Sequence, residues 1–498
     1  MEMNNINTFE EALSCIAELK NRIAELTRQL DWFRRQLFGQ KSEKLADLSS
    51  DTPYLPGLEL ENSSGKPVPA AETVREHERK KRETNGWNEI PADLPREEVI
   101  ITDPKAEAAG LKQIGFEVSE RLAWHEKRFF VKVIKRAKYV NPDNALDGVV
   151  TAPAPADAFG LECSRTKFDS SFVAGVVVDK IENHLPLYRQ TEIMKREGLP
   201  ISRCTLQHLF TRTAEMLEPL YERMKALTDS CPVIHGDETP VKLQQPGQGK
   251  CKNAYMWVKM TAVGPPVVVF HFADSRSQDV ANELYKNYYG TIIRDHYAGY
   301  DRLPAEHAGC WAHVRRRFFE ADQSGYAEAR PFLALIRNLY SAEYQARSRA
   351  EHKESEKALF AERRFARKDS AALVHEFFEL CEQRQKTEIP SSPLGKAIAY
   401  AVNQKSALEK FLHDPRINID NNPAENVIRP IALGRKNWLF AGTEEGGKNL
   451  AILASFAATC HKNNVNFSKW LNMILTKYPE TPVSQIETLL PHQQHGDD

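Results

Sequence analysis

Two aspartates fall in short apolar segments, where a carboxylate is costly unless it is paired or bound to a metal. Asp237 interrupts an apolar run that begins at Val233 and resumes at Val241, and Asp295 ends the segment 291–295. Hard cations such as Mg2+ take carboxylate oxygens as ligands and keep several waters. Two aspartates delivered by neighbouring strands could share one divalent cation, so these residues indicate a candidate metal site.

The segments around the two aspartates predict the elements that position them. Residues 255–261 alternate apolar and polar side chains, and residues 267–272 form a solid apolar run, as strands do. A helical pattern covers residues 277–288, and a further strand ends on Asp295. The order strand, strand, strand, helix, strand predicts an α/β domain with one aspartate in its first strand and one at the end of its last.

A third carboxylate, Glu425, lies roughly 130 residues after Asp295, beyond a long helical block at 325–412. One interpretation is local: Asn422 suits an N-cap, Pro423 the first helical position, and Glu425 completes a capping box. The other makes Glu425 a metal ligand against a phosphate backbone, because cations and an aromatic residue follow it closely. These residues are Arg429, Arg435, Lys436 and Trp438.

Residues 166–215 are helical with one break, and the layout around the break is that of a helix-turn-helix. The break at 197–202 contains a glycine and ends on a serine that suits an N-cap. Two packed helices without a DNA role are the alternative. In the DNA-binding interpretation the start of the second helix faces the groove. The residues there are Ser202, Arg203, Thr205 and Gln207.

An apolar seam near the N-terminus predicts self-association. Seven apolar residues, spaced alternately by three and four, run without a break from Ile16 to Leu37. This is the a/d pattern of a coiled coil over roughly three heptads. One face of an ordinary amphipathic helix is the alternative, and we expect a homo-oligomer formed through residues 16–37.

Length and composition bound the class of protein. A chain of 498 residues is too long for one core, and 41% hydrophobic with 27% charged residues describes a soluble globular protein. No apolar run approaches the ~20 residues that cross a bilayer, and the N-terminus lacks a secretory pattern. The eight cysteines are scattered without a Cys-x-x-Cys pair, as in reduced cytoplasmic proteins. The net charge of −1 is compatible with a nucleic-acid binder whose basic residues are clustered.

Several motifs, in order and over almost the whole chain, resemble those of the transposases of the insertion sequence sixty-six family. In the core they are His-Gly-Asp-Glu-Thr-Pro at 235–240, Asp-His-Tyr-Ala-Gly-Tyr at 295–300, Cys-Trp-Ala-His-Val-Arg-Arg-Arg-Phe-Phe at 310–319, Asp-Asn-Asn-Pro-Ala-Glu-Asn-Val-Ile-Arg at 420–429 and Gly-Arg-Lys-Asn-Trp at 434–438. Two further matches are Leu-Phe-Gly-Gln-Lys-Ser-Glu-Lys at 37–44 and His-Leu-Pro-Leu-Tyr-Arg-Gln at 184–190.

The resemblance implies an RNase H-like catalytic core with a large helical insertion and an Asp-Asp-Glu triad. Carried onto this chain, the triad is Asp237, Asp295 and Glu425, and the activity is cutting and joining the DNA ends of an insertion sequence. Two Mg2+ (or Mn2+) ions about 4 Å apart would clamp the attacking and leaving oxygens. Asp237 would bridge both ions, and Asp295 and Glu425 would each hold one. Candidates for steadying the scissile phosphate are His313, Arg316 and Arg429.

The resemblance also implies a bacterial cytoplasmic protein associated with the nucleoid, with DNA and small accessory proteins of the same element as partners and no membrane. The expected multidomain α/β organisation is a coiled-coil helix at 1–45, a linker at 46–95, a small β-rich module at 96–155, a helix-turn-helix-like region at 156–230, the first part of the core at 231–320, a helical insertion at 321–415, the helix of the catalytic glutamate with its basic segment at 416–445, and C-terminal helices and a tail at 446–498.

One departure from the family concerns zinc. The family carries two Cys-x-x-Cys pairs that form a zinc ribbon, and this chain has none at the matching positions 105–108 and 141–144. There is no cysteine between Cys15 and Cys163, and the residues present cannot replace four thiolates. We therefore expect no zinc and a β-rich module held by apolar packing.

Two other functional classes compete with the enzyme. A catalytically inactive coiled-coil DNA-binding regulator fits the missing zinc ligands but not an intact triad. A structural helical scaffold leaves the three placed carboxylates unexplained.

Overall fold

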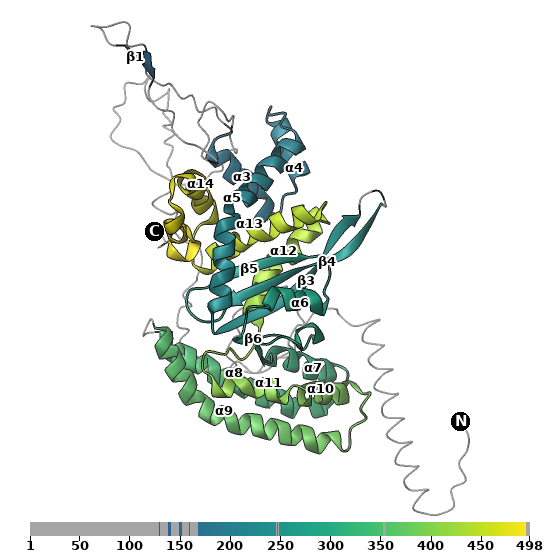
Figure 1. Ribbon diagram of the computed structural model, residues 1–498. Coiled ribbons are helices and arrows are strands. Elements are labelled where there is room, and N and C mark those ends of the chain that lie inside the picture. Colours follow the sequence, from purple (N-terminus) through teal and green to yellow (C-terminus); the bar gives the residue numbers. More distant parts are fainter. Residues whose placement is uncertain are drawn as a thin grey trace, which may run out of the picture. The chain divides into compact units, whose positions relative to one another are not determined.

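The computed structural model describes residues 129, 138–140, 149–151, 159, 168–245, 247, 249–351 and 355–494 (Figure 1). The expected coiled coil at 16–37, the linker and the positions of the missing zinc ligands lie outside these residues. Of the β-rich module, the strands β1 (Lys138–Val140) and β2 (Val149–Thr151) are described, and they pair antiparallel.

A five-stranded mixed sheet with the order β5-β4-β3-β6-β7 positions the first two carboxylates. The strands β3 (Val233–Gln245), β4 (Lys250–Thr261) and β5 (Val268–Ala273) form an antiparallel meander, in agreement with the alternation in the sequence. The short strands β6 (Thr291–Ile293) and β7 (Glu306–Ala308) run parallel to β3. Helix α6 (Gln278–Tyr285) follows β5 and supplies the crossover that a parallel pairing requires. The predicted α/β class is confirmed, with most of the described chain in helices.

Both faces of the sheet are covered because its strands alternate apolar side chains. On one face, Met256, Val258 and Phe270 pack against helices α12 (Asn422–Trp438) and α13 (Glu444–Lys462). On the other, Ile234 and Trp257 pack against the tyrosines of α6 and of the loop after β6. The sheet therefore holds α12, the helix of Glu425, directly against β3.

Three of the described helices precede the sheet and include the segment that the sequence predicts to be helix-turn-helix-like. They are α3 (Ser170–Ile181), α4 (Leu187–Arg196) and α5 (Arg203–Ser230). Ser202 caps α5 as predicted, with its hydroxyl oxygen accepting from Thr205 N at 3.1 Å. Helix α5 is 28 residues long and extends far beyond the turn, because its apolar face packs against α13 in a hydrophobic core that α14 (Phe467–Lys477) also lines.

The predicted helical insertion lies between β7 and α12 in the sequence. It follows α7 (Trp311–Gln323) and comprises α8 (Arg330–Glu351), α9 (Glu356–Gln385), α10 (Pro393–Val402) and α11 (Lys405–His413). Helices α8 and α9 lie side by side as a long hairpin (Figure 1). Trp311 of α7 packs on Phe377 of α9 with ring centroids 5.1 Å apart, so the insertion shares an aromatic core with α7.

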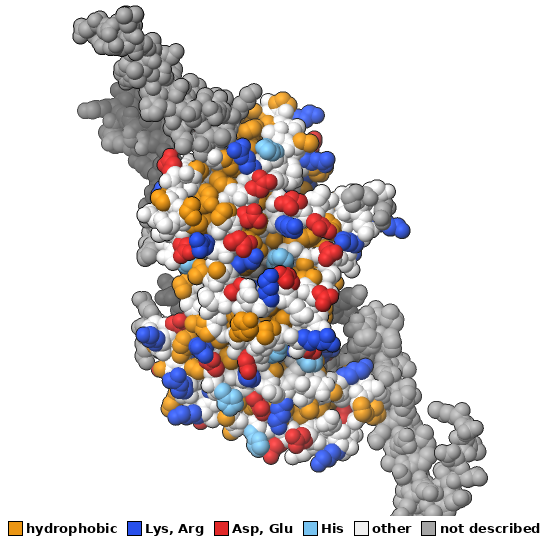
Figure 2. Space-filling model, in the orientation of Figure 1, with side chains coloured by type: hydrophobic (Ala, Val, Ile, Leu, Met, Phe, Trp, Pro, Cys, Tyr) orange, Lys and Arg blue, Asp and Glu red, His pale blue; other side chains and the backbone are white. Residues whose placement is uncertain are grey.

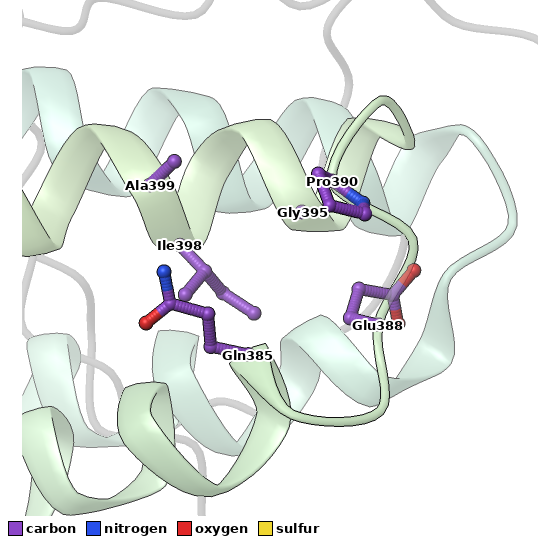
Figure 3. A pocket seen from close by; sticks show the side chains of 6 residues that line it. All are labelled: Gln385, Glu388, Pro390, Gly395, Ile398 and Ala399. Carbon is purple, nitrogen blue, oxygen red and sulfur yellow. The ribbon is translucent and has the colours of Figure 1, made fainter.

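A cavity of about 50 Å3 lies where α9 turns into α10 (Figure 3). Its lining residues are Gln385, Glu388, Pro390, Gly395, Ile398 and Ala399. This volume holds a water molecule or two and not a nucleotide. None of the helices that the structure describes combines the length and the apolar character needed to cross a membrane.

Candidate active site

Asp237 lies in the middle of β3, where the strand is closely surrounded. Gly236 precedes it because a Cβ there would lie 2.8 Å from the Tyr285 hydroxyl and 3.1 Å from Ile292. The Asp237 carboxylate is half-buried and accepts from Glu238 N at 2.9 Å. The position of Asp237 along β3 is thus fixed by the pairing of β3 with its neighbouring strands β4 and β6.

Glu238 points to the opposite face of β3, as the alternation of a strand predicts. Its side chain is only 1% exposed and pairs with the Arg276 guanidinium. Its other oxygen accepts from the Tyr300 hydroxyl at 2.7 Å. Both carboxylate oxygens are therefore occupied, and Glu238 is no candidate for the metal site.

Asp295 lies two residues beyond β6, level with Asp237. The parallel register places His235 opposite Ile293, so two further residues on each strand bring Asp237 and Asp295 to the same level. Arg294 fixes this loop by donating to the carbonyls of Asp295 at 3.1 Å and Tyr297 at 2.9 Å. The Asp295 carboxylate itself accepts from Tyr297 N at 3.1 Å.

Glu425 lies in the first turn of α12, and the capping-box interpretation is wrong. The N-cap is Asn421 rather than Asn422, and no side chain caps the helix. The Asn421 side chain instead bonds to His235 and to Gly236 O of β3. The Glu425 carboxylate lies 3.8 Å from His313 Nδ1 and 3.6 Å from the Arg316 guanidinium of α7.

The three carboxylates interact electrostatically. Burial, as the main cause, together with the negative charges of Glu238, Asp295 and Glu425, raises the pKa of Asp237 to about 8, against one backbone hydrogen bond. Like charges held together in a partly buried site destabilise one another. A cation among these carboxylates would relieve that repulsion.

The donor set fits a hard divalent cation. Glu425 Oε1 and His313 Nδ1 are buried, face one another and have no hydrogen-bond partner within the described part of the chain. Cys310, His313 and Glu425 also offer ligand atoms within 4.8 Å of one another. Burial raises the pKa of the Cys310 thiol far above its usual range, so it stays protonated and is a poor ligand. Carboxylate oxygens with an imidazole nearby remain, which suits Mg2+ or Mn2+.

The predicted phosphate-binding residues divide into two groups. Arg316 of α7 and Arg429 and Lys436 of α12 are exposed. Arg435 is engaged instead, because it donates to Thr239 Oγ1 at 3.0 Å and to Pro240 O and so ties α12 to β3. Trp438 is half-buried and packs against the strands and α13.

The four residues predicted to face a DNA groove lie at the start of α5. Helix α5 packs against α13. Ser202, Arg203 and Gln207 are exposed and Thr205 is half-buried. On the face seen in Figure 2, Lys and Arg side chains are interspersed with Asp and Glu rather than gathered in one basic patch. Phosphate contacts on this face would therefore come from individual residues.

The residues that hold the carboxylates in place were not predicted from the sequence. His235, Asn418 and Asn421 link β3 to the segment before α12. The only sign of this link in the sequence was a histidine within an apolar run, two positions before Asp237. Contacts between residues more than 180 positions apart leave no local pattern.

Two family models match the chain. Residues 165–449 match the model described as "Transposase IS66 family", and residues 25–99 match one described as "Transposase C of IS166 homeodomain".

The chain is also similar to uncharacterized proteins of Sinorhizobium fredii (strain NBRC 101917 / NGR234). Protein y4qI is 32% identical over 94% of this chain and 89% of its own length. Protein y4jD is 29% identical over 97% of both chains, and y4hP is 27% identical over 94% of this chain and 88% of its own. The similarity thus extends through residues 165–449 and beyond them at both ends.

Proposed function

The chain belongs to the IS66 family of transposases, and we propose that it cuts the DNA ends of its insertion sequence and joins them to a target. The observation that carries the proposal is the convergence of Asp237, Asp295 and Glu425. They come from β3, the end of β6 and the first turn of α12, and the charges of Asp295 and Glu425 act on Asp237.

We infer an RNase H-like core from the sheet. An antiparallel meander followed by two parallel strands in the order β5-β4-β3-β6-β7 supports this assignment. The helical insertion α8–α11 between the second aspartate and the glutamate supports it as well. The same proposal includes self-association through residues 16–37 and DNA recognition through α4 and α5.

Each residue has a distinct part in the proposed reaction. When bound, Mg2+ or Mn2+ polarises the scissile phosphate and lowers the pKa of the attacking water. Asp237, on which the charges of both other carboxylates act, would supply ligand oxygens from strand β3. His313 and Arg316 lie against Glu425, and the Arg316 guanidinium, which is 55% exposed, would donate hydrogen bonds to a phosphate from its outer side.

The remaining cations bind duplex DNA rather than the reacting phosphate. Lys436 and Arg429 lie on the exposed side of α12 and add sequence-independent, salt-sensitive affinity. Arg435 contributes indirectly, because its hydrogen bonds to β3 keep α12 in register with Asp237. Binding and cleavage are thus separable.

The test is a strand-cleavage assay on the element's own end sequence, with Mg2+ or Mn2+ and with accessory proteins supplied. We expect Asp237→Asn, Asp295→Asn and Glu425→Gln each to reduce cleavage at least 100-fold while DNA binding is retained. Glu444→Gln, an exposed carboxylate at the start of α13, is the control and should cleave normally.

Two results would contradict the proposal. Normal cleavage by Glu425→Gln together with loss in Glu444→Gln would show that the third ligand is misassigned. A wild type that binds the ends but never cleaves them would favour the alternative of an inactive DNA-binding regulator.

A further inference from the structure

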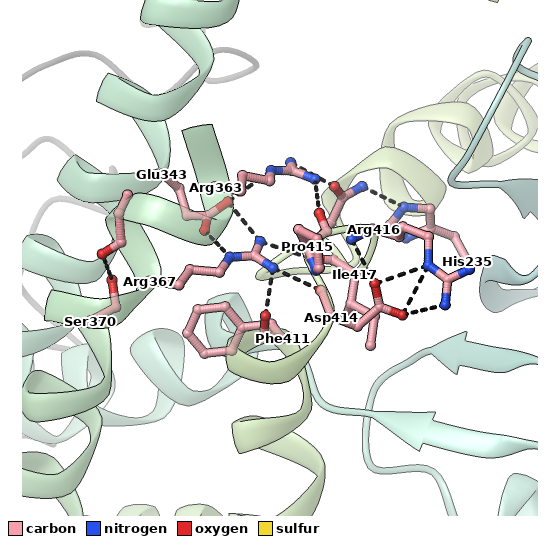
Figure 4. A network of polar contacts seen from close by, with 12 residues as sticks. His235, Glu343, Arg363, Arg367, Ser370, Phe411, Asp414, Pro415, Arg416 and Ile417 are labelled. Atoms are coloured by element: carbon pink, nitrogen blue, oxygen red, sulfur yellow. Dashed lines mark hydrogen bonds and ion pairs between the residues drawn. The ribbon is translucent and has the colours of Figure 1, made fainter. Parts of the chain in front are cut away.

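A buried cluster of charges joins the two long helices of the insertion. Glu343 of α8 ion-pairs with both Arg363 and Arg367 of α9, and the three side chains are 8%, 5% and 2% exposed (Figure 4). Arg367 donates to both Glu343 oxygens, at 2.6 and 3.0 Å. Two guanidinium groups thus share one carboxylate, and one positive charge is left without a carboxylate partner in this cluster.

The two arginines also donate hydrogen bonds to the segment 411–418, which runs from the end of α11 into the loop before α12. Arg367 donates to the carbonyls of Phe411, Asp414 and Ile417. Arg363 donates to Pro415 O at 3.2 Å and to Asn418 Oδ1 at 2.8 Å. Helix α9 therefore fastens the segment 411–418, which is the end of α11 and the start of the loop that leads to the helix of Glu425.

A chain of hydrogen bonds continues from Asn418 into β3, and each bond fixes which atom donates and which accepts in the next. Because Arg363 occupies the oxygen of Asn418, the amide nitrogen of Asn418 faces His235 Nε2, 2.9 Å away. His235 Nε2 must then accept, so the ring proton is on Nδ1 and is donated to Asn421 Oδ1 at 2.9 Å. The amide nitrogen of Asn421 in turn donates to Gly236 O at 2.9 Å.

We propose that His235 is a positioning residue of the cleavage reaction, which in its neutral Nδ1–H tautomer clamps the helix of Glu425 to the strand of Asp237. His235 lies two residues before Asp237, and Asn421 lies four residues before Glu425. The insertion acts through Arg363, which orients Asn418 and so selects the tautomer. His235 is fully buried, and both of its ring nitrogens are taken by these two asparagine side chains. This inference rests on the proposed triad.

The tautomer is measured first, on the full-length, metal-free protein labelled with 15N-histidine. The ring nitrogen signals of His235, assigned by their loss in His235→Asn, should show a neutral ring with its proton on Nδ1 at neutral pH. A proton on Nε2, or a doubly protonated ring, would overturn the proposal whatever the activity of the protein.

The positioning role is measured by Mn2+ binding in calorimetry without DNA, beside cleavage of the end sequence. Partners that orient metal ligands typically contribute 10- to 100-fold in metal affinity. We expect His235→Asn to weaken Mn2+ binding at least 10-fold and to slow cleavage at saturating Mn2+, with DNA affinity within twofold of wild type. His271→Asn, at a half-buried histidine on β5 of the same sheet, is the control and should change none of these.

Asn418→Ala gives the same test outside the strand, should His235→Asn fail to fold. It removes the donor to His235 from a half-buried loop position and should also weaken Mn2+ binding. Either folded variant with Mn2+ affinity and cleavage within twofold of wild type would overturn the proposal. A wild type without Mn2+ binding or cleavage would instead count against the proposed function. The measured tautomer of His235 would still test whether His235 joins the helix of Glu425 to the strand of Asp237.

Discussion

Removing the Glu343 carboxylate should destabilise the protein strongly. In Glu343→Ala, two guanidinium groups that are at most 5% exposed would face each other without a counter-charge. Burial already lowers the pKa of Arg363 to about 10, with Glu343 opposing this shift and Arg367 adding to it. Breaking a buried ion pair by removing one partner costs about 3–5 kcal/mol, because the other charge stays buried and uncompensated.

The assay is equilibrium unfolding in urea, followed by tryptophan fluorescence. The control is Glu222→Ala, which removes the exposed i,i+3 pair with Lys225 and should change the free energy of unfolding by less than about 0.5 kcal/mol. A loss below about 1 kcal/mol in Glu343→Ala would refute the reasoning, because it would mean that the charges are solvated or relax at little cost.

A triple replacement separates stability from positioning. Glu343→Leu with Arg363→Met and Arg367→Met removes all three buried charges and should recover most of the lost stability, since well-packed apolar residues often substitute for buried ion pairs. The segment 411–418 would still lack its donors, so cleavage should stay low. Full recovery of cleavage would show that the segment holds its position without the arginines.

Three further predictions concern other parts of the chain. The pKa of Asp237 is raised to about 8 in the folded metal-free protein, from about 4 in the unfolded chain. Between about pH 4 and about pH 8, Asp237 is therefore protonated in the folded state and ionised in the unfolded state. The folded state loses stability as the pH rises from about 4 to about 8. Asp237→Asn should remove this loss, seen as a smaller fall in Tm between about pH 5 and pH 8; an unchanged fall would mean that other groups cause it. Ser202→Ala removes the cap of α5 and should lower the free energy of unfolding by about 1 kcal/mol in urea, whereas no change would mean that water replaces the cap. Deleting residues 1–45 should lower the mass in light scattering if the apolar seam joins chains, and an unchanged mass would exclude that seam as the oligomer contact.

The strands that carry the aspartates were predictable because their signal is local. Apolar residues mark β3 to β5, alternating in β4 and nearly continuous in β5, and the order of elements predicted that neighbouring strands carry Asp237 and Asp295. The start of β4 was missed: residues 250–253 are polar and largely exposed, and they are in a strand because β3 extends alongside them. Pairing with β3 thus outweighs the low strand preference of the residues at the start of β4.

The environment of Glu425 could not be predicted from its neighbours in the sequence. Local rules favoured a capping box, but the Asn421 side chain is taken by His235, 186 positions away. The charged pattern of 325–412 predicted helices correctly and gave no sign that Glu343, Arg363 and Arg367 are buried. Whether a charged side chain is buried depends on the partners that the fold brings to it. These partners are distant in the sequence, so the local spacing of residues does not reveal them.

Mapping the bound cation on the polypeptide tests the central claim most directly. Fe2+ bound in place of Mg2+ produces radicals, in the presence of ascorbate and peroxide, that cut the backbone beside the ion. If Asp237, Asp295 and Glu425 hold one metal centre, the wild type should be cut near all three positions, Mg2+ or Mn2+ should suppress the cuts, and Glu425→Ala should reduce all of them together. Cuts that Mg2+ does not suppress, or suppressible cuts confined to another part of the chain, would contradict the account.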